Sequence, residues 1–103
     1  MSQYRRVASV DAVPPGKGVV VEIGGKKVAI FNVDGKFYAV DNACSHRGGP
    51  LGEGSLRGKL VNCPWHGAQF DITNGQVFSF PATEGIASYS TTVEGDGIWV
   101  AIY

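Results

Sequence analysis

Cysteine and histidine are both scarce in this sequence, which has only two of each among 103 residues. Two cysteines exclude a disulfide-rich scaffold, and a lone structural disulfide would be unusual in a reducing compartment. The start of the sequence lacks the apolar middle of a secretory signal, so we expect a cytoplasmic protein. A metal or redox role for Cys44 and Cys63 is therefore favoured over a disulfide between them.

An excess of charge of one sign and long apolar runs are also lacking. Nine Lys and Arg balance nine Asp and Glu, and this balance argues against nucleic acid or anionic membrane as a main partner. No stretch approaches the roughly 18 apolar residues that a membrane helix needs. The length is that of one compact domain, so we expect a single domain over residues 1–103 that acts as a monomer.

What the chain does have is fifteen glycines, spread between short apolar, β-branched and aromatic runs. This alternation is typical of an all-β sandwich or barrel, and long helices are not expected. The dipeptides Gly24-Gly25, Asp34-Gly35 and Asn74-Gly75 predict tight turns between antiparallel strands. The expected strands are 18–23, 27–33 and 36–40 in a first meander, 59–62, 68–71 and 76–80 in a second, and 86–93 with 98–102 in a final hairpin.

Two short segments carry the chemistry, Cys44-Ser45-His46 and Cys63-Pro64-Trp65-His66, with sixteen residues between His46 and Cys63. Two thiolates and two imidazoles form a metal-ligand set. Zinc sites usually pair cysteine with cysteine and histidine with histidine, whereas the order here is Cys, His, Cys, His. This order favours two matching loops, each giving its Cys to one iron and its His to the other, over a structural zinc site.

The pattern Cys-x-His followed by Cys-x-x-His at this separation resembles the Rieske iron–sulfur proteins. The resemblance extends over nearly the whole chain and implies one [2Fe–2S] cluster, with Cys44 and Cys63 on the inner iron and His46 and His66 on the outer iron. It also implies an antiparallel β sandwich with an inserted cluster-binding subdomain at about 42–81.

Glycines near these ligands have an expected role. The stretch 47–52 (RGGPLG) lets the chain pass close to the cluster and aim backbone N–H groups at its sulfurs, and Gly67 and Ala68 are expected to do the same. Phe80-Pro81 either resembles the family's proline-bearing third loop or simply ends a strand. Asp41-Asn42, just ahead of the first ligand, is expected to be a turn.

The family places its histidine-ligated iron at an exposed tip, so we expect partners to dock there. The surface concerned is largely apolar and consists of His46, His66, Gly48, Pro50 and Trp65. Trp65 would present an aromatic face to a partner, shield the cluster from water, or serve only in packing.

Both histidines belong to the ligand pattern, so none remains for a mononuclear iron triad or a nucleophile–histidine pair, and no nucleotide-binding glycine fingerprint is evident. We therefore expect an electron carrier and not an enzyme. The resemblance implies the ferredoxin component of a ring-hydroxylating dioxygenase or related oxygenase. It would pass single electrons from a flavin-containing, NAD(P)H-dependent reductase to a terminal oxygenase. The alternatives are the small Rieske subunit of a nitrite reductase and, from another class, a zinc-stabilised interaction module.

The resemblance also predicts a low reduction potential. High-potential relatives in respiratory complexes carry a second cysteine pair where this chain has Gly49 and Trp65, and a serine and a tyrosine where it has Ala68 and Phe70. Hydrogen bonds from those hydroxyls to sulfur stabilise the reduced state. Without them we expect about −150 mV, above a four-cysteine ferredoxin at about −400 mV.

Overall fold

The structure is a computed structural model that describes residues 4–43, 49–65, 67–79 and 84–101. Its strands in chain order are β1 (Tyr4–Ser9), β2 (Gly18–Ile23), β3 (Lys26–Val33), β4 (Lys36–Asp41), β5 (Ser55–Arg57), β6 (Leu60–Asn62), β7 (Gln69–Asp71), β8 (Val77–Ser79), β9 (Ser88–Tyr89), β10 (Thr91–Glu94) and β11 (Gly97–Ala101). Two short 3-10 helices, η1 (Val10–Ala12) and η2 (Leu51–Glu53), are the only helices in these ranges. Neither has the length or apolar character needed to cross a membrane.

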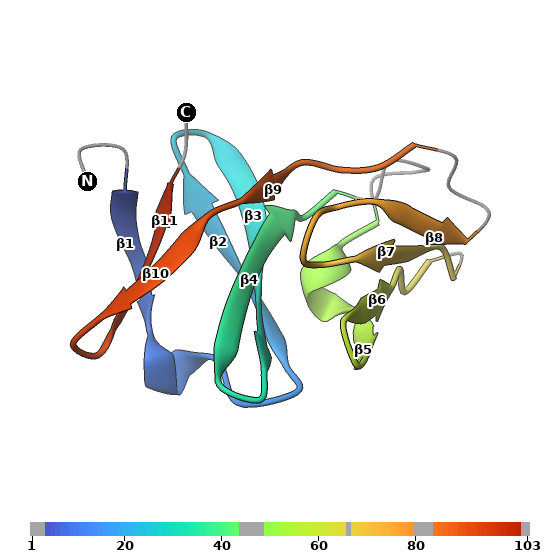
Figure 1. Cartoon of the computed structure of the whole chain (residues 1–103). Coiled ribbons are helices and arrows are strands. Elements are labelled where there is room, and N and C mark those ends of the chain that lie inside the picture. Colours follow the sequence, from blue (N-terminus) through green and yellow to red (C-terminus); the bar gives the residue numbers. More distant parts are fainter. Residues whose placement is uncertain (1–3, 44–48, 66, 80–83, 102–103) are drawn as a thin grey trace.

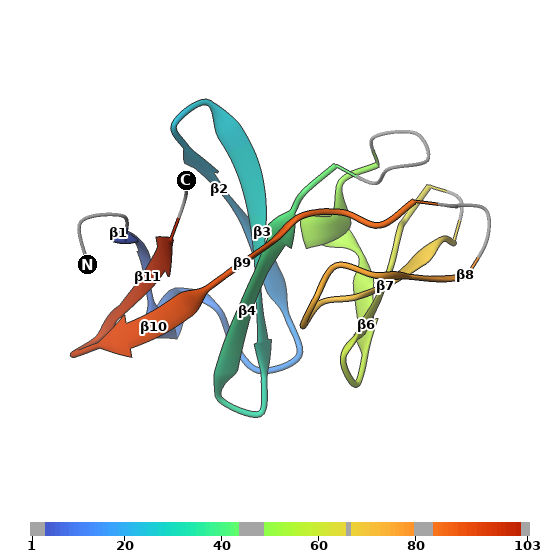
Figure 2. The same ribbon diagram turned by 45° about the horizontal axis from the view of Figure 1, so that its top comes forward.

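The strands form three antiparallel sheets, which lie side by side (Figure 1). The first sheet has the order β1-β11-β10, the second β2-β3-β4-β9, and the third β5-β6-β7-β8. Turning the molecule by 45° keeps the second sheet between the other two (Figure 2). The predicted all-β, antiparallel class is therefore confirmed.

Strand β3 lies at the centre of the molecule and is buried on both faces. Val28 and Ile30 belong to a core shared with Ile98 of the first sheet. Ala29 and Phe31 alternate to the opposite face, where they belong to a second core. A strand covered on both faces needs a nearly continuous apolar run, which explains why this segment is apolar at successive positions.

The second core joins the small third sheet to the second sheet. It contains Phe31 of β3 together with Leu51 of η2, Val61 of β6 and Phe70 of β7, all fully buried. Removing a side chain of this size from water stabilises a fold by about 1.5–3 kcal/mol. The third sheet thus packs firmly against the second, and this packing fixes where the connection between β6 and β7 lies.

The three turns predicted between antiparallel strands are confirmed. Gly24-Gly25 and Asp34-Gly35 each connect two paired strands as a two-residue turn, and all four residues have positive φ, as type I′ hairpin turns require. Asn74-Gly75 lies between β7 and β8, also as predicted. Both meanders therefore have the expected strand order.

The structure has two strands that were not predicted, and one predicted strand is divided between two sheets. Strands β1 and β5 were not expected, although they pair with β11 and β6. The single strand predicted over 86–93 is wrong, because β9 pairs with β4 in the second sheet and β10 pairs with β11 in the first. The chain changes sheets at Ser90, whose carbonyl accepts the Ala101 N–H at 3.0 Å. Side-chain alternation continues through such a change, so periodicity alone does not reveal it.

Candidate metal centre

Cys63 begins the connection between β6 and β7, which is closed at its base by two hydrogen bonds. The Cys63 N–H donates to the Ala68 carbonyl at 2.7 Å, and the Gly67 N–H donates to the Cys63 carbonyl at 3.0 Å. The Cys63 thiol is free, and the residue is only 3 % exposed. The two hydrogen bonds fix the backbone that carries this thiol, so the fold sets the position of the sulfur.

Gly49, at the described end of the first ligand segment, lies against this thiol. A Cβ on Gly49 would be 2.5 Å from Cys63 Sγ and 3.3 Å from the Trp65 ring, so only glycine fits at this position. The contact brings the end of the first segment beside the second. The predicted approach of the stretch 47–52 to the cluster sulfurs stays a prediction, since the contact at Gly49 involves the cysteine sulfur.

The first ligand segment is held at its base by Asn42 and by a β-bridge between Ala43 and Pro50. The Asn42 carbonyl accepts the Leu51 N–H at 2.8 Å, and Asn42 Oδ1 accepts the Gly52 N–H, also at 2.8 Å. Asn42 is only 7 % exposed. Asn42 was expected to be only a turn residue. In the structure its hydrogen bonds also join the two ends of the first ligand loop.

Asp41, also predicted to lie in a turn, is instead the last residue of β4. Its Oδ1 accepts a hydrogen bond from the Tyr89 hydroxyl at 2.5 Å, and its Oδ2 accepts the Ala87 N–H at 3.4 Å. Desolvation by burial, the hydrogen bond to Asp41 and the charge of Asp41 raise the pKa of Tyr89 to about 12. Sequence reasoning missed this pair because 48 positions separate the two residues and no local pattern links them.

Only one of the four predicted ligands, Cys63, lies within the described residues. Cys44, His46 and His66 lie outside them, as do Arg47, Gly48, Phe80 and Pro81. Within the described ranges no three Cys, His, Asp or Glu side chains gather as a metal site. The full ligand set thus stays a prediction. The buried thiol and the glycine backbone against it fit an iron–sulfur centre, in which sulfur ligands accept backbone N–H contacts.

Three side chains near Cys63 differ in exposure. Ala68 and Phe70 are fully buried, with Phe70 in the second core. Trp65 is 57 % exposed, so its interpretation as a packing residue only is wrong. Its ring lies beside Gly49 and is available to a partner.

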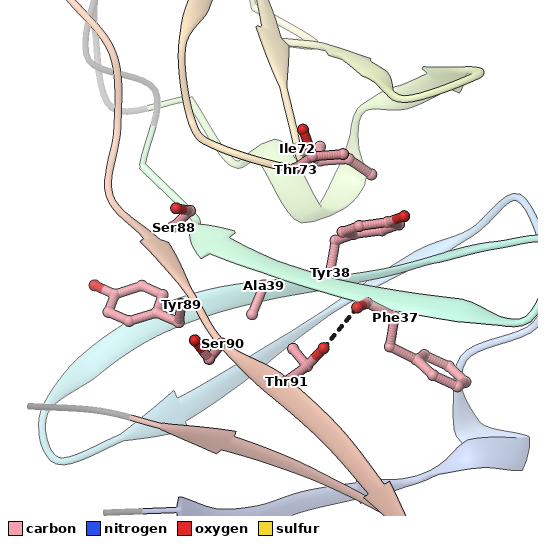
Figure 3. Close-up of a pocket in the computed structure, with 9 residues that line it drawn as sticks. All are labelled: Phe37, Tyr38, Ala39, Ile72, Thr73, Ser88, Tyr89, Ser90 and Thr91. Atoms are coloured by element: carbon pink, nitrogen blue, oxygen red, sulfur yellow. Dashed lines mark hydrogen bonds between the residues drawn. The ribbon is translucent and has the colours of Figure 1, made fainter.

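An open cleft of about 270 Å³, not lined by Cys63, lies between β4, β9 and the turn that follows β7 (Figure 3). Its lining includes residues with hydroxyl groups, such as Tyr38, Thr73 and Thr91. None of its lining residues is a cysteine, a histidine or a charged residue. The cleft therefore has no metal-binding chemistry of its own.

A buried thiol in a tight loop, with a glycine backbone against it, lies at one end of a small three-sheet β protein. The sequence profile described as the Rieske [2Fe-2S] domain matches residues 3–90. The chain therefore belongs to the Rieske family and carries one [2Fe–2S] cluster.

Known relatives and solved structures agree with this family. The biphenyl dioxygenase ferredoxin subunit of Pseudomonas sp. (strain KKS102) is 40% identical over 98 residues, which is 94% of this chain and 90% of that protein. The ferredoxin of carbazole 1,9a-dioxygenase from Nocardioides aromaticivorans IC177 superimposes with a TM-score of 0.91 at 29% identity, over 96% of this chain and 97% of that one. A chain from the complex of reduced oxygenase and oxidized ferredoxin in carbazole 1,9a-dioxygenase has a TM-score of 0.89 at 28% identity, over 98% of this chain and 94% of that one.

Proposed function

We propose that this protein is the ferredoxin component of a ring-hydroxylating dioxygenase or related oxygenase system, and that it transfers single electrons. The observation that carries this proposal is the match to the biphenyl dioxygenase ferredoxin subunit, which covers nine tenths or more of both chains. The similarity is thus to a ferredoxin as a whole and not to one domain of a larger enzyme. One domain over residues 1–103, with a cluster-binding subdomain at about 42–81, is part of the proposal.

The proposed ligands are Cys44 and Cys63 for the inner iron and His46 and His66 for the outer iron. A [2Fe–2S] cluster with these ligands supplies a one-electron couple at a potential above that of four-cysteine clusters. Cys63 offers its thiolate from the closed base of the β6–β7 connection. Gly49 leaves the space that close approach to this sulfur requires.

The proposed partners are a flavin-containing, NAD(P)H-dependent reductase as electron donor and a terminal oxygenase as acceptor. The similar carbazole dioxygenase complex pairs a reduced oxygenase with an oxidized ferredoxin, which supports the second partner. Balanced charge supports a protein partner over nucleic acid or an anionic membrane. We propose that the protein works in the cytoplasm as a monomer, as an electron carrier and not as an enzyme.

The two alternatives differ in metal and in partner. A zinc-stabilised interaction module is not supported, because the family is that of the [2Fe-2S] Rieske domain. A nitrite reductase small subunit would share the cluster but would stay bound to its large catalytic subunit. The ferredoxin components among the relatives favour the free carrier.

The test is purification of the untagged protein from its own cells, with metal analysis and a visible spectrum. We expect two iron atoms per chain, a coloured protein that purifies alone, and reduction by NADH through a flavoprotein reductase, followed by reoxidation by an oxygenase. Zinc with no visible absorption would overturn the cluster assignment. Copurification with a nitrite reductase subunit would overturn the proposed partners.

A further inference from the structure

Residues 85–89, which we name the strap, run between the third sheet and the end of β4. Figures 1 and 2 both show this segment passing from the side of β7 and β8 into β9. On the side of the third sheet, the Ile86 N–H donates to the Gly75 carbonyl at 2.8 Å. A Cβ on Gly75 would be 1.9 Å from the Ile86 carbonyl oxygen, so the strap lies directly on the backbone there.

On its other side the strap is bound to the end of β4. The Asp41 N–H donates to the Ala87 carbonyl at 2.9 Å. Strand β9, which ends the strap, pairs with β4 through Ala39 opposite Tyr89 and Val40 opposite Ser88. Backbone contacts thus connect the strap to both the third sheet and the strand that leads into the first ligand segment.

One side-chain contact completes this attachment. The Tyr89 ring packs against the core between the first and second sheets, and its hydroxyl donates to Asp41 Oδ1 at 2.5 Å. Hydrogen bonds to a carboxylate are about twice as strong as those between neutral groups. Asp41 precedes Asn42, which joins the two ends of the ligand loop through Leu51 and Gly52. A displacement of Asp41 would therefore move the base of that loop.

We propose that Tyr89, acting through Asp41, is a positioning residue for the base of the first ligand loop, formed by Asn42, the Ala43–Pro50 bridge and Leu51. The hydrogen bond holds this base in one place and so slows the loss of the cluster. The proposal rests on the ligand assignment made above for Cys44 and His46. Groups hydrogen-bonded to the ligands themselves typically change metal affinity by about 10–100-fold when they are removed, and Tyr89 acts from further away, so an effect at the lower end of this range is expected.

The chain offers a matched control in Thr91. Its hydroxyl donates to the Phe37 carbonyl at 2.7 Å, and this part-buried bond also joins β4 to the segment that crosses it (Figure 3). Phe37 lies near the start of β4, however, whereas Asp41 lies at its end. Thr91→Val thus removes a hydroxyl hydrogen bond to the same strand β4, made from β10 and not from β9, away from the ligand loop.

The experiment compares holoprotein variants for cluster loss and for folding stability. Loss of visible absorption in the presence of an iron chelator gives the first rate, and urea unfolding gives the free energy. We expect cluster loss about tenfold faster in Tyr89→Phe and within about twofold of wild type in Thr91→Val. Asp41→Asn keeps one neutral acceptor for the Tyr89 hydroxyl and should lose the cluster more slowly than Asp41→Ala, which should behave like Tyr89→Phe.

The comparison separates positioning from general stability. Equal rates of cluster loss in Tyr89→Phe and Thr91→Val, at equal free energies of unfolding, would overturn the positioning role. If Tyr89→Phe does not fold, the comparison uses Asp41→Asn and Asp41→Ala. Equal rates of cluster loss in these two variants would overturn the positioning role as well. Failure of the proposed function gives a different result, because the wild type would then hold no iron–sulfur cluster at all.

Discussion

Gly49 and Cys63 lie so close together that a methyl group on the glycine would be 2.5 Å from the sulfur. The two residues come from different loops and are in contact through packing alone. This packing joins the described end of the first ligand segment to the thiol of the second. The geometry at Gly49 should therefore control whether the site can be filled.

Gly49→Ala is expected to reduce the amount of bound cluster while the β fold remains. The added methyl group requires either the sulfur or the backbone to move, and overpacking of this kind costs about 1–3 kcal/mol. Iron per chain and far-ultraviolet circular dichroism measure the two properties. Gly97→Ala is the control, because its Cβ meets the Arg6 side chain, far from Cys63. Full iron content in Gly49→Ala would contradict this account.

Cys63→Ser is expected to abolish cluster assembly, and Cys44→Ser should do the same. A neutral hydroxyl does not replace a thiolate on ferric iron. Iron analysis and the visible spectrum after reconstitution are the measurements. If either variant kept its full colour and iron, the ligand assignment would be wrong for that residue.

Trp65→Glu or Pro50→Glu is expected to slow electron transfer to the oxygenase about tenfold, with an unchanged cluster spectrum. Transient redox interfaces are small, below about 1,200 Å² in total, and loss of one aromatic anchor is worth about 1.4 kcal/mol or more. Stopped-flow kinetics give the rate. Val93→Glu is the control, because Val93 is an exposed apolar residue on β10 in the first sheet, away from Cys63 (Figure 1). Equal rates of electron transfer in Trp65→Glu, Pro50→Glu and Val93→Glu would refute docking at the end of the molecule that carries Cys63.

Ala68→Ser and Phe70→Tyr are expected to raise the reduction potential from about −150 mV, each by tens of millivolts. About 60 mV for one electron corresponds to 1.4 kcal/mol, the scale of one good hydrogen bond. Both positions are fully buried, so a hydroxyl added there has little access to water and needs a partner in the protein. Phe78→Tyr is the control, because Phe78 lies in the same sheet but is 64 % exposed. Voltammetry that places the wild type well above zero millivolts would show that the low-potential comparison is wrong.

Tyr89 is expected to remain protonated in the folded protein at about pH 11, because its pKa is raised from 10 to about 12. The folded state holds this proton more tightly than the unfolded state. The contribution of Tyr89 to stability is therefore fully present below pH 10 and is lost as the pH rises toward 12. Carbon-13 NMR of the four tyrosine rings follows each ionisation. The late-titrating signal should be missing in Tyr89→Phe, and its persistence there would assign it to another tyrosine.

Local features of this protein were determined by the sequence alone. Gly24-Gly25 and Asp34-Gly35 lie in the predicted turns because backbone conformation at such dipeptides depends on the residues themselves. The spacings Cys44-x-His46 and Cys63-x-x-His66 indicated the family for the same reason, since ligands in one short loop must follow each other at fixed intervals.

Relations between distant segments were decided only by the tertiary structure. The pairing of β1 with β11 and the change of sheets at Ser90 depend on which strand edge is available, which periodicity does not report. The role of Asn42, the hydrogen bond from Tyr89 to Asp41 and the contact of Gly49 with the Cys63 thiol likewise have no local signature. Each of them exists because the folded sheets bring together atoms that lie far apart along the chain.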